Sequence, residues 1–323
     1  MERPKSQIAL PVSVVIPTMN RPQSLEKTIS SLLSHPYIPN EIILVDQSTD
    51  LLLRKKNEEI GSLKVTDLKI RYFYLEIPSS TKARNIGTSY VTNDILVYAD
   101  DDIEVEPDTI GNIYEIMQQG EVALLAGIDK NSKASTRGAS WLGYLFGTKS
   151  YAKRNIGHIT NSVLGRYPDR IEGQVLTEWA MGYFFIVRKS LVAKWQIAWD
   201  EKLTSYAYAE DLDFSCRYCR HAAAEGFKCV LDTRIQVYHM YTKEYRVPSK
   251  KSSFMYIINR KYLGYKLGFG FRSSLMQLFA NFSLLLRRLV AKQRPQDIIS
   301  AQFRAWRYGK QLKKGEINAT FYE

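Results

Sequence analysis

Three consecutive aspartates, Asp100, Asp101 and Asp102, follow directly after the apolar run Val97–Ala99. Adjacent carboxylates repel one another, so such a cluster is tolerated mainly where a cation neutralises it. Mg²⁺ and Mn²⁺ take oxygen ligands and usually divide their coordination between one or two carboxylates and the phosphates of a substrate. The cluster therefore predicts metal-assisted chemistry on a phosphate-bearing substrate, with a plain acidic turn between a strand and a helix as the alternative.

Short apolar, β-branched runs alternate with helical patterns before this cluster. The predicted strands and helices are Val12–Ile16, Pro22–Leu33, Glu41–Val45, Asp50–Ile60, Ile70–Leu75, Thr81–Tyr90 and Ile95–Ala99, in alternating order. This alternation is typical of βαβ units with a mostly parallel sheet. Ligands of such sheets bind beyond the carboxyl ends of the strands. We therefore expect the polar loops at those ends to converge with Asp100–Asp102 on one crevice.

The pattern changes in the second half of the chain. Residues 128–179 have little periodicity, which predicts a long excursion from the core. Beyond it we predict a buried strand over Trp179–Val187, a helix over Glu210–Ala224, a short strand over Lys228–Leu231 and an edge segment over Val237–Met240. Glu210 and Asp211 begin the predicted helix, where a carboxylate either caps the helix or is kept ionised by the helix dipole.

The net positive charge of the chain comes from its last quarter. Residues 1–245 contain 29 Lys and Arg against 30 Asp and Glu, whereas residues 246–323 contain 16 against 3, so the tail carries the whole net charge of +12. We predict a catalytic domain over 1–245, with halves at 12–127 and 128–245, and a basic helical region over 246–323. A charge imbalance of this kind favours an anionic surface as partner.

Residues Ser273–Ala291 combine a wide apolar helix face with a basic rim that includes Arg287 and Arg288. Such a helix lies on an anionic membrane, docks on the catalytic domain, or does both. No apolar stretch reaches 18 residues, and the first residues lack the apolar region of a signal peptide. We therefore expect a cytoplasmic protein in peripheral contact with the cytosolic face of a membrane, and no nucleic-acid partner.

Six stretches in order resemble glycosyltransferase family 2, an inverting family with the GT-A fold. They are V-S-V-V-I-P-T-M-N-R (12–21), E-I-I-L-V-D-Q-S-T-D (41–50), T-K-A-R-N-I-G (81–87), Y-A-D-D-D (98–102), A-M-G-Y-F-F-I-V-R-K (180–189) and A-E-D-L-D-F-S-C-R (209–217). The resemblance implies a Rossmann-like, mostly parallel α/β sheet flanked by helices. Residues 12–127 would bind a nucleotide-sugar, and residues 128–245 would hold the acceptor and the catalytic base. The chain departs from the family in lacking two common loop glycines.

The same resemblance implies a role for each matching residue. Contacts to the nucleotide-sugar are implied for Pro17, Thr18, Asn20, Arg21, Asp46, Lys82, Arg84, Asn85, Asp100 and Asp101. Asp46 would accept from a ring N–H of uracil or thymine. Arg84 and Asn85 fall in the first turn of the predicted helix, where the dipole and free N–H groups favour phosphate.

The metal and the acceptor are assigned in the same way. The implied ligands of Mn²⁺ or Mg²⁺ are Asp100, Asp102 and His239, and Asp211 matches the general base that deprotonates the acceptor hydroxyl. Candidate acceptor contacts are Gly182 and Glu210, together with Trp179 and Tyr183, whose aromatic rings we expect to stack on a sugar face.

The sequence thus predicts a metal-dependent inverting glycosyltransferase. It would move a sugar from a UDP- or TDP-sugar to a hydroxyl of a glycan or lipid-linked glycan, in cell-surface polysaccharide synthesis. One alternative is a sugar-nucleotide nucleotidyltransferase, although the loop P-T-M-N-R-P after the first strand lacks the glycines such enzymes normally use. The other is a catalytically dead protein whose basic tail binds membrane or nucleic acid.

Overall fold

The computed structural model describes residues 7–131, 137–204, 207–241 and 248–322. Its first hundred residues alternate strands and helices, as predicted: β1 (Ile8–Thr18), α1 (Pro22–Leu33), β2 (Tyr37–Asp46), α2 (Leu51–Gly61), β3 (Lys69–Tyr74), α3 (Ser80–Tyr90) and β4 (Ile95–Ala99). Local signals fix the helix starts. Pro22 opens α1, where its missing N–H costs nothing, and Asp50 caps α2 by accepting from the N–H groups of Leu52 and Leu53.

The rest of the chain adds shorter strands and the C-terminal helices. In chain order these are β5 (Ile103–Val105), α4 (Thr109–Gln118), β6 (Val122–Asp129), α5 (Arg137–Leu145), β7 (His158–Ile159), β8 (Gly165–Arg166), β9 (Gln174–Leu176), β10 (Phe184–Arg188), α6 (Lys189–Lys194), α7 (Glu210–Ala224), β11 (Lys228–His239), α8 (Ser249–Lys266), α9 (Gly270–Val290), α10 (Gln296–Arg307), α11 (Gly309–Lys313) and the 3₁₀ turn Ala319–Tyr322.

The central sheet has the strand order β3-β2-β1-β4-β10-β6-β11-β5, with β9 beside β11. Strands β3, β2, β1 and β4 are parallel to one another, and β6 and β11 are parallel to each other. Strand β10 runs antiparallel between β4 and β6, so β6 and β11 point the same way as β4. The mostly parallel α/β sheet predicted from the sequence is therefore confirmed.

Two predicted strands differ from the structure. Strand β10 begins at Phe184 rather than at Trp179, because residues just before it are held by α7, where the Gly182 N–H donates to Asp211 Oδ2 (2.8 Å). The predicted short strand and edge segment are one strand, β11. Its end is interior to the sheet, since Val237 pairs with Val105 of β5 on one side and with Asp129 of β6 on the other.

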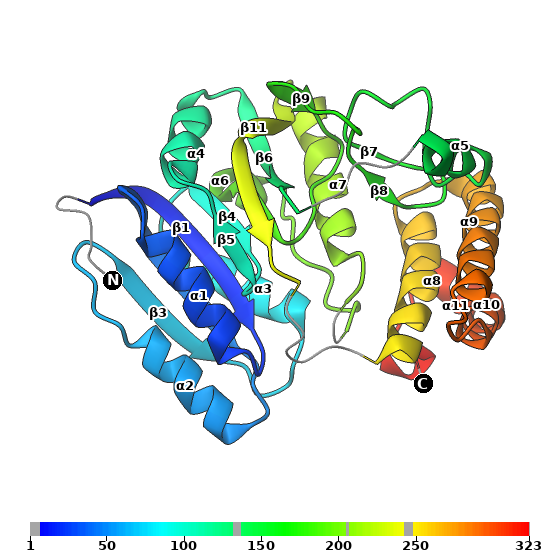
Figure 1. Cartoon of the computed structure of the whole chain (residues 1–323), viewed down its shortest axis with the longest axis horizontal. Helices are drawn as coiled ribbons and strands as arrows, with labels where there is room; N and C mark the ends of the chain where they lie inside the picture. Colours follow the sequence, from blue (N-terminus) through cyan, green and yellow to red (C-terminus); the bar gives the residue numbers. More distant parts are fainter. Residues whose placement is uncertain (1–6, 132–136, 205–206, 242–247, 323) are drawn as a thin grey trace.

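Buried apolar side chains fill both faces of the sheet, and a third cluster lies under the C-terminal helices. That cluster contains Trp179 and Leu212 from the sheet-bearing part together with Leu263 of α8 and Ile298 of α10. Figure 1 shows α8 to α11 gathered at one end of the molecule, away from α2 and β3. The sheet and the tail thus share buried surface. The predicted boundary between 245 and 246 falls in 242–247, outside the described residues.

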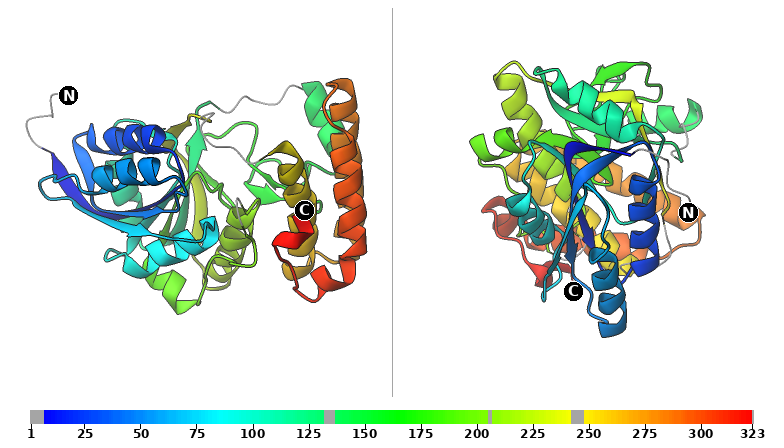
Figure 2. Two further views of the ribbon diagram at one scale, coloured as in Figure 1. Left: turned by 90° about the horizontal axis from the view of Figure 1, so that it is seen from below. Right: turned by 90° about the vertical axis from the view of Figure 1, so that its left-hand side faces the viewer.

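The tail divides into a docked part and an exposed part. Helix α8 is docked, because Asn259 Nδ2 donates to the Tyr208 carbonyl (2.8 Å) and Lys266 Nζ lies 2.9 Å from Asp213 Oδ2. Helix α9 lies at the outer edge of the molecule in Figure 2, and several of its apolar side chains are exposed. Among the described residues, no helix has the length and apolar character needed to cross a bilayer.

Glu41 of β2 is a buried carboxylate that ties three segments together, away from the carboxyl ends of the parallel strands. It accepts hydrogen bonds from Ser13 Oγ (2.5 Å) of β1 and from the backbone N–H of Thr92 (2.8 Å), and Arg71 of β3 lies 2.6 Å away. Burial alone would raise the pKa of Glu41, but these hydrogen bonds and the charge of Arg71 outweigh it, so the pKa lies below the ordinary 4.5.

We expect Glu41→Gln to lower the free energy of unfolding by about 2–4 kcal/mol at neutral pH. The donors of Ser13, Thr92 and Arg71 lose the carboxylate, and the new amide N–H₂ group cannot accept hydrogen bonds from them. A depressed native pKa gives stability that is present above the unfolded value and is lost as the pH falls through the native value. The difference between variant and wild type should therefore shrink below about pH 4.5. Urea titrations across pH would measure it. Glu59→Gln on the exposed face of α2 is the control, and equal losses for the two variants would contradict the assignment.

Candidate active site

Asp100, Asp102 and His239 are the one group of three metal-ligating side chains found within the described residues. Each offers one ligand atom, and these atoms all lie within 4.8 Å of one another. His239 Nε2 is 3.2 Å from Asp102 Oδ1. Two carboxylates and an imidazole are a donor set that suits Mn²⁺.

The sheet brings these residues together. The three aspartates connect β4 to β5, and β5 pairs antiparallel with the end of β11, where His239 lies opposite Ile103. The Met240 N–H donates to the Asp102 carbonyl (2.9 Å), which closes the pairing. The strand register therefore fixes the imidazole beside the aspartates, although His239 is far from them in the sequence.

The surroundings of His239 fit a metal ligand. Its ring is flanked by Tyr183 and Tyr241, with ring centroids 5.3 and 4.1 Å away, and its Nδ1 is buried without a hydrogen-bond partner. Burial alone would lower the pKa of His239, but the hydrogen bond with Asp102 and the nearby Asp100 raise it above its ordinary value. The site thus attracts positive charge to the imidazole, which a divalent cation would supply in place of a proton.

Asp101, the middle aspartate, points away from this cluster. It accepts from Thr18 Oγ1 (2.7 Å) and from Arg21 (2.9 Å), and it is 4% exposed. Burial raises its pKa to about 6 even though the charge of Arg21 opposes the shift. Asp101 therefore anchors the loop after β1 to the end of β4, and it holds Arg21 3.5 Å from Asp102.

Arg84 of α3 joins the two halves of the site. Its guanidinium lies 2.9 Å from Asp100 Oδ1 and 2.9 Å from Glu210 Oε1, and it stacks over the Trp199 ring at 4.6 Å. The side chain is 4% exposed. Glu210 and Asp211 are consecutive at the start of α7, and the charges of Arg84 and Asp100 act on Asp211. The two ionic contacts of Arg84 therefore bring the triple-aspartate corner close to Asp211.

Asp211 is held by backbone donors. Its Oδ2 accepts from the Gly182 N–H (2.8 Å) and its Oδ1 from its neighbour, the Leu212 N–H (2.7 Å). Burial raises its pKa above the ordinary value, and burial raises the pKa of Glu210 to about 8 against the opposing charge of Arg84. A Cβ added at Gly182 would lie 3.1 Å from the Asp211 Cβ, so this glycine provides the room that the carboxylate needs.

Several residues expected to contact the nucleotide-sugar bind the protein itself. Asp46 is fully buried and accepts from Ser48 (2.6 Å) and from Tyr72 (2.8 Å). Asn20 holds the loop after β2 by accepting from the N–H groups of Thr49 and Asp50. Pro17 is buried at the end of β1. The polar atoms of Asp46 and Asn20 thus stabilise the loops of the protein itself, and the fully buried Asp46 has no face open to a ligand.

Helix α3 also begins earlier than predicted. It starts at Ser80, so Arg84 and Asn85 lie in its second turn, whereas the exposed Lys82 lies in the first turn. Backbone N–H groups without a partner inside the helix are confined to the first turn, so the helix-dipole argument applies to Lys82 rather than to the other two, and the Lys82 N–H is itself capped by Ser79 Oγ (3.3 Å). Asn85 instead brackets Trp199, donating to its carbonyl (3.0 Å) and accepting from its N–H (2.8 Å).

The aromatic residues expected to stack on an acceptor sugar are buried. Trp179 is 5% exposed and its Nε1 donates to the Arg166 carbonyl (3.2 Å), while Tyr183 is 6% exposed and its hydroxyl donates to the Gly127 carbonyl (2.8 Å). Neither ring presents a face to a ligand in this structure. Of the other two candidate acceptor contacts, Gly182 donates to Asp211, and Glu210 lies in ionic contact with Arg84.

Three residues of the site, Trp199, Asp129 and Tyr241, were not anticipated from the sequence. Trp199 lies under Arg84. Asp129 accepts from the backbone N–H of His239 (3.2 Å) and from the Tyr241 hydroxyl (2.8 Å). Asp129 ends β6, a strand that the apolar run Val122–Ala126 would have indicated. Nothing local in the sequence marks Trp199, because its partner is more than a hundred residues away.

Comparison with known proteins shows to which family the chain belongs. The Glycosyl transferase family 2 model matches residues 13–192, more than half of the chain. The chain belongs to glycosyl transferase family 2. No curated protein sequence matches it closely.

Solved structures share the fold at low sequence identity. The mannosyltransferase PcManGT from Pyrobaculum calidifontis, in complex with GDP-Man and Mn²⁺, has a TM-score of 0.55 at 14% identity over 97% of this chain and 88% of that chain. GalNAc-T7 with UDP, GalNAc and Mn²⁺ has a TM-score of 0.54 at 17% identity over 83% of this chain and 54% of that chain. S. aureus TarS 1-349 with UDP-GlcNAc has a TM-score of 0.50 at 14% identity over 93% and 91%. The alignment thus spans about half of the GalNAc-T7 chain, and the GT-A type fold is confirmed.

We expect His239→Ala to weaken Mn²⁺ binding by about tenfold or more, because one of three protein ligands is removed. Titration with Mn²⁺ followed by electron paramagnetic resonance measures free and bound ion directly. His221→Ala, an exposed histidine on α7, should leave the affinity unchanged. Equal Mn²⁺ affinity in wild type and His239→Ala would exclude His239 as a ligand.

Proposed function

We propose that this chain is a metal-dependent inverting glycosyltransferase that uses a UDP- or TDP-sugar. One observation carries the proposal: Arg84 lies in ionic contact with Asp100, which belongs to the cluster with Asp102 and His239, and with Glu210, the neighbour of Asp211. A nucleotide-sugar needs its diphosphate neutralised on one side and an ionised base for the acceptor on the other. The candidate site has residues for both tasks, and its aspartates and His239 lie at strand ends, where such folds bind ligands.

The donor side would be built from the β1 and β4 ends. Asp100, Asp102 and His239 would hold Mn²⁺ or Mg²⁺, which when bound neutralises the charge that builds on the departing diphosphate. Arg21, half-buried beside Asp101 and Asp102, and Lys82, exposed in the first turn of α3, are the cations available to the phosphates. Thr18 positions Arg21 indirectly by holding Asp101.

The acceptor side would depend on Asp211. An acceptor hydroxyl must lose its proton as it attacks the anomeric carbon, and a positioned base typically contributes 10²–10⁴-fold, about 3–5 kcal/mol. The Gly182 and Leu212 N–H groups fix the carboxylate and stabilise its charged form. Glu210 is engaged by Arg84 and is not free to attack the sugar. A single base and a direct displacement predict inversion at the anomeric carbon.

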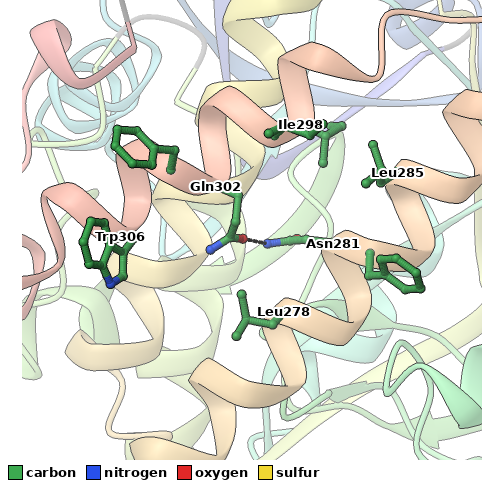
Figure 3. Close-up of a pocket in the computed structure, with 9 residues that line it drawn as sticks. Leu278, Asn281, Leu285, Ile298, Gln302 and Trp306 are labelled. Atoms are coloured by element: carbon green, nitrogen blue, oxygen red, sulfur yellow. Dashed lines mark hydrogen bonds between the residues drawn. The ribbon is translucent and has the colours of Figure 1, made fainter.

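We further propose that the acceptor is a glycan or lipid-linked glycan used at a membrane in polysaccharide synthesis. Helices α9 and α10 form an open apolar groove of about 530 Å³, lined by residues that include Leu278, Phe282, Phe303 and Trp306. Figure 3 shows Leu278, Leu285, Ile298 and Trp306 among the lining residues, together with the Asn281–Gln302 hydrogen bond. Phe303 and Trp306 are 59% and 71% exposed, and the +13 tail favours an anionic surface.

We expect Asp211→Asn to reduce sugar transfer by about 10²–10⁴-fold while nucleotide binding stays within a few fold, because the amide cannot take the proton. The assay screens UDP-, TDP- and GDP-sugars for Mn²⁺-dependent release of free nucleotide, and then measures transfer and product stereochemistry by NMR. Glu225→Gln, at the other end of α7, is the matched carboxylate-to-amide control.

Loss of nucleotide binding in Asp211→Asn would make Asp211 a structural residue. A retained anomeric configuration would refute the single-base displacement. Failure of wild type to consume any nucleotide-sugar would refute the proposed function itself.

We expect the double change Phe303→Ser and Trp306→Ser to weaken binding to phosphatidylglycerol vesicles by about tenfold or more. Each of the two side chains would bury its apolar surface in the bilayer, and such burial contributes about 1.5–3 kcal/mol per side chain. Vesicle sedimentation measures the bound fraction, with phosphatidylcholine vesicles testing the need for negative charge. Leu52→Ser, a 75% exposed leucine on α2, should bind as wild type does. Vesicle binding that is equal in all three proteins would remove this face from the membrane proposal.

A further inference from the structure

The helix that begins with Glu210 and Asp211 is preceded by two alanines in the left-handed region of the backbone. Ala207 has a φ of 50° and Ala209 has a φ of 70°. The alanine Cβ disfavours this region, so residues in it persist where the surrounding structure holds them. Ala209 is the N-cap of α7 and has no side chain that could cap the helix. The entry into α7 therefore depends on contacts from other parts of the chain as well as on its own backbone.

Asn259 of α8 supplies such a contact. Its Nδ2 donates to the carbonyl of Tyr208, the residue between the two alanines (2.8 Å), and Asn259 has no exposed surface. Its Oδ1 accepts from the Tyr322 hydroxyl (2.7 Å). A carbonyl only accepts hydrogen bonds, so the amide must present its N–H₂ group to Tyr208 and its oxygen to Tyr322. The three residues form a hydrogen-bonded relay from the turn Ala319–Tyr322 to the start of α7.

The turn Ala319–Tyr322 is itself held in place against α8 (Figure 2). Tyr322 and Phe321 are both buried, and the Phe321 ring stacks on Tyr308 with ring centroids 4.1 Å apart and an angle of 6° between the planes. Both side chains belong to the apolar cluster that also contains Leu212, the neighbour of the proposed base. The Tyr322 hydroxyl thus has a fixed position from which it orients the Asn259 amide.

The relay bears on Asp211 because Tyr208 lies only three residues before it. The Asp213 N–H donates to the Ala209 carbonyl (3.2 Å), so the backbone passes directly from this segment into the first turn of α7. The Asp211 carboxylate is held on its other side by the Gly182 N–H (2.8 Å). A displacement of the Tyr208 carbonyl would therefore move the Asp211 backbone relative to Gly182 and change the aim of the carboxylate.

Other contacts keep α8 docked on α7 without passing through Asn259. Lys266 Nζ lies 2.9 Å from Asp213 Oδ2, and Arg220 of α7 donates to the Leu267 carbonyl (2.8 Å). These contacts lie farther along both helices than the relay does. A small change at Asn259 or at the residue that orients it should leave the helices docked and disturb mainly the entry into α7.

We propose that Asn259 and Tyr322 are positioning residues for the proposed base Asp211. Neither side chain touches the reacting groups in this mechanism, and both act through the Tyr208 carbonyl. The inference rests on the proposed function, because it takes Asp211 as the base. It gives the C-terminal region a part in the reaction itself, in addition to the proposed contact with a membrane.

Steady-state kinetics of the full chain, with a nucleotide-sugar that wild type consumes, test the relay. Tyr322→Phe removes one hydroxyl and keeps the ring, and it should lower kcat by about threefold to tenfold. Asn259→Ala should lower kcat by about tenfold or more, because a small displacement of a catalytic group slows the reaction strongly. The KM for the nucleotide-sugar should stay within about twofold, since the aspartate corner is unchanged. Tyr308→Phe, the same change on the ring that stacks on Phe321, is the matched control and should leave kcat unchanged.

The combined variant Asn259→Ala and Tyr322→Phe distinguishes a relay from two independent structural roles. If Tyr322 acts through Asn259, the combined variant should have the kcat of Asn259→Ala alone, whereas the losses of independent residues multiply. Multiplied losses would overturn the proposal. So would a rise in KM with kcat unchanged, or a loss in both single variants no greater than that of Tyr308→Phe.

A second arm needs no turnover. In protein labelled with ¹⁵N-glycine, the Gly182 amide signal reports the hydrogen bond to Asp211, and both single variants should shift it while the exposed Gly226 stays unchanged. A Gly182 signal that is unmoved in both variants would refute the relay. Failure of wild type to consume any nucleotide-sugar would instead refute the proposed function, so the two failures are distinguishable. If Asn259→Ala does not fold, Tyr322→Phe carries the test in both arms.

Discussion

The buried guanidinium of Arg84 is the interaction on which the rest of the site depends. It is held between Asp100, at the end of β4, and Glu210, at the start of α7, and it rests on the Trp199 ring. Two carboxylates held this close would repel each other, and a cation fixed between them turns that repulsion into attraction. The distance between the donor corner and the proposed base is therefore set by one side chain on α3.

Around this ion pair, the polar groups are arranged so that few of them are free to move. Asp101 holds Thr18 and Arg21, Asp46 holds Ser48, and Asn85 holds Trp199. Several motif residues thus form the frame of the site. In the proposed reaction the chemical work falls to Asp100, Asp102, His239 and Asp211, and preorganisation of this kind is what makes electrostatic catalysis effective.

The C-terminal helices extend the same electrostatic logic. The first 245 residues are almost neutral, and the tail holds the whole net positive charge. Helix α8 brings part of that charge inside the protein as the fully buried Arg260, while α9 and α10 present apolar side chains outward.

The sequence by itself determined the elements and the chemistry-bearing loops. Alternating apolar runs, Pro22 and the cap at Asp50 act through neighbouring residues, and the six ordered motifs indicated the family and the GT-A fold, because short-range signals survive in one dimension. Only the tertiary structure decided which motif residues come together and which are buried. The β5–β11 register that brings His239 to Asp102, the burial of Asp46, Trp179 and Tyr183, and the contacts of Arg84 with Asp100 and Glu210 all depend on packing between segments far apart in the chain. Burial and partner choice are properties of that packing, so a residue's type fixes what it is able to do, and its neighbours in space fix what it does.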